Sequence, residues 1–241
     1  FLNGGGNFYT DSYSSSEGAY GAMTSGGVPN VNNQGDMGTN GTMTLGGSGT
    51  ANGDIIVTNP PYTPALAAAL QADLYAQGTI SPPNVVSLEP KVQLPAVDYN
   101  PVGVAQTHNK NSSPTYAGSA DPDNPDTIRF DEFNVNSNRT VTIDGHLIMY
   151  VDGDIDLKGT IVLNAGATLQ IIQGDGAGGT PPTLTINGAG FINTDQTPAS
   201  MSIETATTGQ IKLHGGATYY GTIYAPDAPV RFNGNNEIFG S

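Results

Sequence analysis

The sequence predicts an all-β fold, a parallel β-helix or solenoid, with one short flanking α-helix and a long extended, proline-rich segment. The first observation is a series of short apolar alternations in residues 129–241, each closed by Gly, Asn or Asp. Alternation with a period of two places one side chain inward and the next outward, as in a strand with one buried row. The second observation is the composition, 37% hydrophobic and 12% charged residues. A disordered chain of this polarity would carry more charge, so a folded protein with a thin core is expected.

The predicted strands are short and follow one another with almost no loop between them. The clearest lie at 141–145, 147–153, 155–159, 161–164, 169–174, 184–188, 201–204, 211–215, 222–224 and 230–234. Asn-Gly pairs at strand ends also suit hairpins, so a sandwich or jelly roll is the alternative. The close spacing and the consistent Ile, Val and Leu favour coils whose corners are turned by Gly or Asn and whose aliphatic rows stack. We therefore assign 129–241 to β-helix coils.

The first half of the chain is less regular. Residues 1–59 are rich in Gly and Asn and repeat the Asn-Gly strand pattern from 38 to 57, which predicts a cap or a further coil. Residues 60–128 hold the predicted helix at about 64–77 and, from 80 to 125, extended chain in which prolines multiply.

The helix has clear start and stop signals. Thr63 is a suitable N-cap, Pro64 suits the first turn and Gly78 suits the end. Leu66, Leu70 and Leu74 share one narrow stripe, which predicts a helix that covers one flank or end of the solenoid.

Charge and composition exclude several classes of protein. Seven Lys and Arg against 21 Asp and Glu give a net charge of -14, and we expect that no basic surface for nucleic acid assembles from seven scattered cations. No apolar run is long enough for membrane insertion. Cysteine is absent, which excludes disulfides and thiolate chemistry. The start at Phe1, without Met or a signal peptide, indicates a mature, processed or trimmed product from which any export signal or anchor has been removed.

Two segments carry a family resemblance. Residues 147–155 and 220–241, above all the string Tyr-Gly-Thr-Ile-Tyr-Ala-Pro at 220–226 and the Asn-Gly-Asn string after it, resemble bacterial exported β-helical repeat proteins. Such proteins are often described as pilus-assembly-associated or surface-anchored. The likeness extends to residues 35–57 and to the Ala-rich helix. It implies a right-handed β-helix at the extracellular face or cell surface of a bacterium, and it supplies no catalytic residue and no cofactor.

One acidic segment is a candidate calcium site. Its carboxylates recur at close intervals, and such groups in a loop can converge several oxygens on one Ca²⁺. The candidate ligands are Asp121, Asp123, Asp126 and Asp131. The alternative is an exposed acidic turn stiffened by proline. The alternating carboxylates of 152–156 are open to the same two interpretations, with corner turns the simpler one.

Aromatic residues gather near the C-terminus. Tyr219, Tyr220 and Tyr224 could stack on sugars as a glycan platform, or they could stack on neighbouring coils within the core. His146 and His214 each lie at a corner between a strand and a glycine, with no Ser/Asp constellation near them in sequence, although either could align with a carboxylate of an adjacent coil.

Together these observations predict an extracellular structural or adhesive protein, either a rigid β-solenoid spacer or a subunit that associates end to end with itself or with other surface and pilus components. A calcium-dependent glycan-binding module is the alternative. A polysaccharide lyase or hydrolase is the third possibility, for which we expect too few cations and no paired carboxylates.

Overall fold

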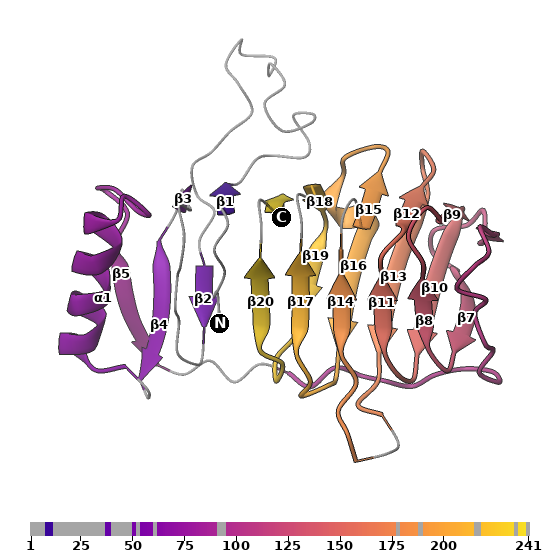
Figure 1. Ribbon diagram of the computed structural model, residues 1–241, viewed down its shortest axis with the longest axis horizontal. Helices are drawn as coiled ribbons and strands as arrows, with labels where there is room; N and C mark the ends of the chain where they lie inside the picture. The colour runs from indigo at the N-terminus through magenta and orange to yellow at the C-terminus, as the bar shows by residue number, and fades with distance from the viewer. Residues whose placement is uncertain are drawn as a thin grey trace, which may run out of the picture.

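The structure is a computed structural model of the 241-residue chain. It describes residues 8–11, 37–39, 50–51, 54–59, 62–90, 95–176, 179–187, 190–214, 218–233 and 236–239. Within this part, every ladder between strands is parallel and there is a single α-helix, so the expected all-β class is confirmed (Figure 1). No described helix has the length and apolar character needed to cross a membrane.

Three parallel sheets form the larger part of the molecule. The first sheet holds β7 (Asp126–Phe130), β10 (His146–Val151), β13 (Thr168–Gln173), β16 (Met201–Thr205) and β19 (Thr222–Tyr224). The second holds β8 (Phe133–Val135), β11 (Ile155–Leu157), β14 (Leu184–Ile186), β17 (Ile211–His214) and β20 (Val230–Asn233). The third holds β6 (Thr115–Ala117), β9 (Thr140–Asp144), β12 (Thr160–Leu163) and β15 (Gly190–Asn193). The chain visits these sheets in the same order repeatedly, so each strand pairs with the one three places further along.

Two smaller sheets contain the N-terminal strands. One has the order β18 (Thr218–Tyr220), β21 (Asn236–Phe239), β1 (Phe8–Asp11) and β3 (Thr50–Ala51). The other has the order β2 (Met37–Thr39), β4 (Ile55–Asn59) and β5 (Val86–Pro90). Because β1 pairs in parallel with β21, segments from the two ends of the sequence lie side by side. The predicted N-terminal coil is described only at these strands, and the rest of residues 1–59 lies outside the described part.

Stacked aliphatic rows form the core between the three main sheets. In the second sheet, Ile155 pairs with Phe133 on one side and with Leu184 on the other, and all three are buried. Burial alternates along β8, β9, β10, β11, β12, β14, β16 and β17, because period two sends every second side chain inward. Burial of one such side chain contributes about 1.5–3 kcal/mol.

Corners of the stack bring backbone into close contact. Gly145 joins β9 to β10. Its φ of +96° is a backbone conformation that residues with a Cβ rarely adopt. At Gly159, a Cβ would lie 2.4 Å from the carbonyl oxygen of Arg139 in the neighbouring turn. These contacts are the physical reason for the glycines that end the predicted strands.

One corner of the core is polar. Gln173 is fully buried, and its Nε2 donates to the carbonyl oxygens of Gly153 (2.9 Å) and Thr183 (3.1 Å), while its Oε1 accepts from Thr205 Oγ1 (3.0 Å). Thr207, also buried, donates to the carbonyl oxygen of Pro182. These side chains supply hydrogen-bond donors to backbone carbonyl oxygens beside the loop that joins β13 to β14.

The helix α1 (Pro64–Ala76) begins and ends close to the predicted positions. Thr63 Oγ1 accepts the N–H of Leu66, and Gly78 follows with φ +69°. The predicted leucine stripe is partly wrong, since Leu66 is 53% exposed, and the buried face consists of Ala67 and Leu74. This face packs with Ile55, Val57 and Ile80 in a separate small core, and Figure 1 places α1 beyond β5 at one end of the molecule.

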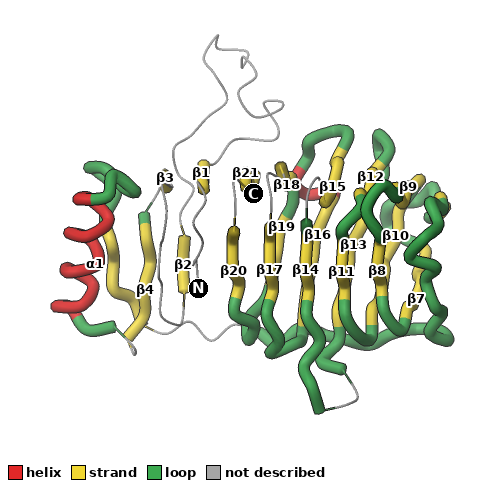
Figure 2. Tube along the Cα trace, viewed as in Figure 1, coloured by secondary structure: helices red, strands yellow, loops and turns green. Residues whose placement is uncertain are grey.

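Residues 95–105, here called the strap, have no regular structure. Figures 1 and 2 show this segment running lengthwise along the stack. Tyr224 of β19 donates through its hydroxyl to the carbonyl oxygen of Pro95 near one end of the strap, and Arg129 of β7 donates to Gly103 at the other. The extended chain that the prolines of 80–125 predict is therefore observed in the strap. The same range also contains two strands, β5 and β6, which were not predicted.

Candidate functional surface

Of the four predicted calcium ligands, the carboxylates of Asp121 and Asp131 have other hydrogen-bond partners. Both carboxylate oxygens of Asp121 accept bonds within one turn, from the Asp123 N–H at 3.1 Å and from Asn124 Nδ2 at 3.0 Å. These bonds hold the pKa of Asp121 below its ordinary value. Asp131 accepts from Thr107 Oγ1 and from the N–H of Glu132, and Asp126 begins β7. In the described part of the chain, no three His, Asp or Glu side chains gather closely enough to hold a metal ion.

The second carboxylate series is also divided among separate partners. Asp152 pairs with Arg129, Asp154 accepts from the backbone and side chain of Thr183, and Asp156 pairs with Lys158 at 2.7 Å. Asp152 and Asp154 flank the corner before β11, and Asp156 projects from the middle of that strand. The fold therefore does not converge these three carboxylates on one point.

The three predicted glycan-stacking tyrosines lie on different parts of the fold. Tyr219 of β18 is 3% exposed, donates to the carbonyl oxygen of Thr222 and meets Phe191 edge-on, with ring centroids 5.7 Å apart. Burial raises the pKa of Tyr219 well above its ordinary value. Tyr220 is its outward neighbour, and Tyr224 lies in the first sheet against the strap. Alternation along β18 and the corner before β19 separate the rings, so they do not form one platform.

A group centred on Asp152 fastens the strap to the first sheet. Arg129 Nε and Nη2 donate to the two oxygens of Asp152 at 2.8 and 2.9 Å, and Tyr99 donates to the same carboxylate. Burial would raise the pKa of Asp152, but the hydrogen bonds from Arg129 and Tyr99 outweigh it and hold this pKa below its ordinary value. The Tyr99 ring meets Tyr150 edge-on and covers Gly174, where a Cβ would lie 2.8 Å from the ring. Sequence reasoning missed this group, because its members are far apart along the chain.

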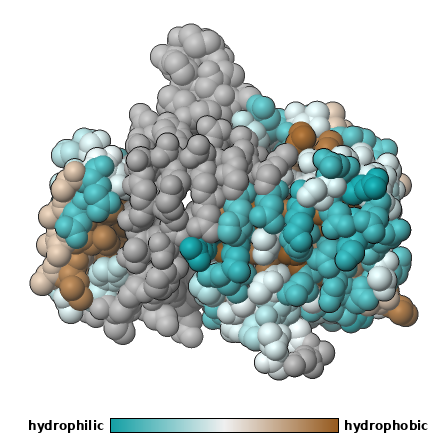
Figure 3. Space-filling model, in the orientation of Figure 1, coloured by the Kyte–Doolittle hydropathy of each residue, from teal (hydrophilic) through white to brown (hydrophobic). Residues whose placement is uncertain are grey.

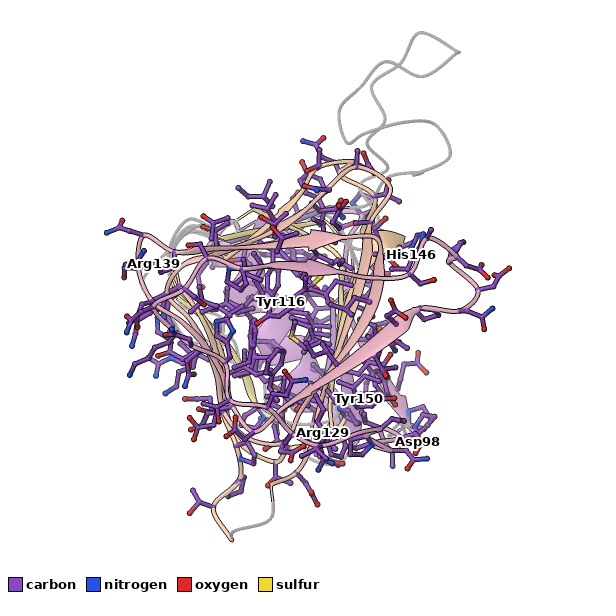
Figure 4. The ribbon with its side chains drawn as sticks, turned by 90° about the vertical axis from the view of Figure 1, so that its right-hand side faces the viewer. Asp98, Tyr116, Arg129, Arg139, His146 and Tyr150 are labelled. Carbon is purple, nitrogen blue, oxygen red and sulfur yellow. The ribbon has the colours of Figure 1, made fainter. Side chains whose placement is uncertain are left out.

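An aromatic cluster closes the core at the β6 end. His108 is 8% exposed and packs against Phe130 and Phe133, with its Nδ1 2.7 Å from the hydroxyl of Tyr116. Figure 4 views this end and shows Tyr116 near the centre of the section. Burial lowers the pKa of His108, since the ring lies among aromatic neighbours.

Most of the cations lie on one side of the molecule. Lys212 and Arg231 belong to the second sheet, Arg139 and Lys158 to the corner that joins it to the third, and Lys110 to the loop whose backbone bonds to that corner. We call these five residues the basic ridge. Of the other two cations, Arg129 is paired with Asp152 and Lys91 lies outside the described residues.

Backbone contacts place Lys110, Arg139 and Lys158 in three successive repeats, and Lys212 and Arg231 in two later ones. The Asn136 N–H donates to the Lys110 carbonyl, the Lys158 N–H to Val135, and the Thr160 N–H to Arg139. Lys212 and Arg231 are direct partners in adjacent strands. Figure 4 shows Arg139 on one side of the section, with Tyr150 and Asp98 on another. The stacking of strands thus returns cations that are distant in the sequence to one side of the molecule, and the expectation that they form no nucleic-acid surface stays a prediction.

The fold and surface define a class of protein, a stack of parallel β-sheets in which no described group of acidic side chains converges on one point. The chain belongs to the family described as Domain of unknown function (DUF7305), whose model matches residues 103–241. The match begins at the strap residue that Arg129 contacts and includes the three main sheets. No curated protein and no solved structure gives a significant match.

Proposed function

We propose that this protein is a right-handed parallel β-helix that serves as a rigid structural or adhesive spacer at the bacterial cell surface. The observation that carries the proposal is the parallel pairing of strands three places apart, in two main sheets of five strands and one of four. Each turn then rests on the next through backbone hydrogen bonds and stacked aliphatic side chains. Right-handedness and surface location rest on the likeness to exported repeat proteins.

The strap supports a spacer function. It runs lengthwise over the first sheet and is bonded to β19 at one end and to the β7–β10 region at the other. A tie of this kind resists separation of the turns, since separation requires loss of the Arg129–Asp152–Tyr99 contacts as well as the ladder bonds. Rigidity along the stack is the property that a spacer needs.

Coverage of the stack ends favours a spacer over a filament-forming subunit. An uncovered solenoid end presents unpaired backbone groups on which another copy can add. Here α1 packs on the sheet that contains β5, and β1 lies along β21. At the other end, the His108 cluster covers the core. The Gln106 backbone also bonds to the β7 edge: its N–H donates to the Arg129 carbonyl, and its carbonyl accepts the Asp131 N–H. We therefore infer a spacer that does not polymerise end to end.

Solution scattering and surface labelling test the proposal together. We expect the purified chain to sediment as a monomer across concentration and to give small-angle scattering of an elongated particle. Antibody should label intact producing cells. Growth in mass with concentration would favour the filament-forming subunit, and the absence of labelling would exclude a surface protein.

A calcium-dependent glycan-binding module is the alternative, and titration distinguishes it. Calorimetry with Ca²⁺ on the wild type and on Asp123→Ala would reveal binding that depends on the acidic turn. A polysaccharide lyase or hydrolase would release products from plant or bacterial glycans. We expect neither result, because Asp121, Asp131 and Asp154 accept hydrogen bonds from separate partners and no described group of three acidic or histidine side chains converges on one point.

A further inference from the structure

Two neighbouring side-chain oxygens on the outer face of the second sheet have no hydrogen-bond partner among the described residues. They are Oδ1 of Asn134 in β8 and Oδ1 of Asp156 in β11, and both atoms are buried. The two residues are direct partners in adjacent strands, whose spacing is about 4.8 Å. A buried acceptor without a donor is unfavourable, and here two such acceptors are neighbours. One hydrogen held between them would satisfy both.

A lysine amine and a second carboxylate lie beside this pair. Lys158 Nζ is 2.7 Å from Oδ2 of Asp156, and the Lys158 N–H donates to the carbonyl of Val135, the residue after Asn134. On the other side, Asn134 Nδ2 donates to Oε2 of Glu132 at 3.2 Å, which holds the nitrogen of the amide. Figure 3 shows this face of the molecule in front, with hydrophilic side chains over β8 and β11.

We propose that Lys158 and Asn134 form an intramolecular isopeptide bond, with Asp156 as the proton carrier. The three residues supply the groups that this reaction needs: an amine, a carboxamide and a carboxyl group in contact with the amine. Pairing of adjacent strands holds these groups together, which replaces an encounter in solution by a reaction within one molecule. The proposal goes beyond the spacer function, because it assigns a covalent modification to two neighbouring turns.

The reaction balances without an outside reagent. The ammonium group of Lys158 gives one proton to Asp156, and the neutral Nζ attacks Cγ of Asn134. The Nζ–Cγ bond forms and the Cγ–Nδ2 bond breaks, while Asp156 delivers its proton to Nδ2 and accepts a second proton from Nζ. The departing ammonia takes up that second proton, which restores the carboxylate. The products are an amide between the two side chains and one ammonium ion, and no electron is transferred.

Proton transfer to Asp156 also accounts for the two unpartnered oxygens. The hydroxyl formed on Asp156 can donate to Oδ1 of Asn134, which satisfies both atoms and draws electron density away from Cγ. The ion pair between Lys158 and Asp156 by itself leaves the Asn134 oxygen unexplained. The chain contains no cysteine, so this bond supplies a covalent tie that disulfides cannot, and it restricts the unfolded chain as a disulfide does.

Mass spectrometry of the intact, purified chain tests the proposal. We expect the wild type to be lighter than its sequence mass by one molecule of ammonia. Lys158→Arg keeps the positive charge but removes the amine, and Asp156→Ala removes the proton carrier, so both variants should have their full sequence masses. Lys212→Arg is the matched control and should keep the loss, because the strand partners of Lys212 are Thr185 and Arg231, neither of which has a carboxamide.

Tryptic digestion locates the bond. The expected product is a branched peptide that joins residues 130–139 to the segment containing Lys158, with no cleavage after that lysine. The full sequence mass in the wild type would overturn the proposal and leave a bridging water as the partner of the two oxygens. Loss of ammonia that persists in Lys158→Arg would also overturn it, since the loss would then come from another site such as the Asn187-Gly188 pair. Either failure leaves the spacer proposal intact, because sedimentation and particle shape do not depend on the bond.

Discussion

Arg129 and Asp152 form a two-point ion pair between neighbouring turns, with Nε 2.8 Å from Oδ1 and Nη2 2.9 Å from Oδ2. The same arginine donates to Gly103 of the strap, and the same carboxylate accepts from Tyr99. The pair therefore joins two turns of the stack and the strap. Its geometry is the paired hydrogen-bond arrangement that favours arginine over lysine.

Replacing Asp152 by Asn should lower the free energy of unfolding by about 1–2 kcal/mol, since a partly exposed ion pair and one hydrogen bond are lost together. Urea denaturation measures the change. Asp98→Asn, at an exposed position on the same strap, is the matched control and should change stability by less than about 0.5 kcal/mol. Equal effects from both variants would mean that the ion pair does not hold the strap.

The contribution of Asp152 should depend on pH in a defined direction. Its folded pKa is lower than the ordinary value of 3.8, so the folded state binds the proton less tightly than the unfolded state does. The stabilisation is therefore complete above about pH 4 and is lost as the pH falls through the folded pKa. The stability difference between wild type and Asp152→Asn should shrink over this range. A difference that stays constant down to pH 2 would contradict the prediction.

Replacing Gly174 by Ala should loosen the strap, because the new Cβ would lie 2.8 Å from the Tyr99 ring. We expect faster proteolytic cleavage in the strap and a loss of about 1–2 kcal/mol. Tyr99→Ala removes the clash, so Gly174→Ala should cost little in that background. Additive costs in the double variant would show that the two residues do not interact.

Stability should fall below neutral pH because of His108. Burial lowers its folded pKa beneath the ordinary value of 6.5, so its contribution is complete above that value and decreases as the pH falls toward the folded pKa. Chemical denaturation between pH 5 and 8 measures this decrease. His108→Phe should reduce the slope. The same slope in His108→Phe would assign the effect to other groups.

Replacing Gln173 by Leu should destabilise the protein strongly. The change leaves the carbonyl oxygens of Gly153 and Thr183 without their donor and Thr205 without its acceptor. Buried polar groups left unpaired cost about 1–3 kcal/mol each, so we expect at least 3 kcal/mol. Ile172→Leu, a volume-conserving change at the preceding position, should cost less than about 1.5 kcal/mol. A neutral Gln173→Leu would mean that water replaces the amide.

Local sequence patterns predicted many of the strands and the helix. Alternation at 147–153 and 155–159 predicted the strands β10 and β11, and the Thr63 and Gly78 signals predicted α1, because each of these features depends on neighbours within a few residues. The strands β7, β15 and β18 were missed. Their apolar residues are fewer, and stacking against flanking strands compensates for the weak local signal.

The sequence by itself determined which side chains face inward, where corners are turned and that the strands belong to one all-β class. Only the tertiary structure decided which turn lies on which. That stacking brought Arg129 to Asp152, placed Tyr99 over Gly174 and gathered five cations on one side. The physical reason is that strand alternation depends only on neighbouring residues. Contacts between stacked strands depend instead on the length of chain that separates them, which varies with every loop.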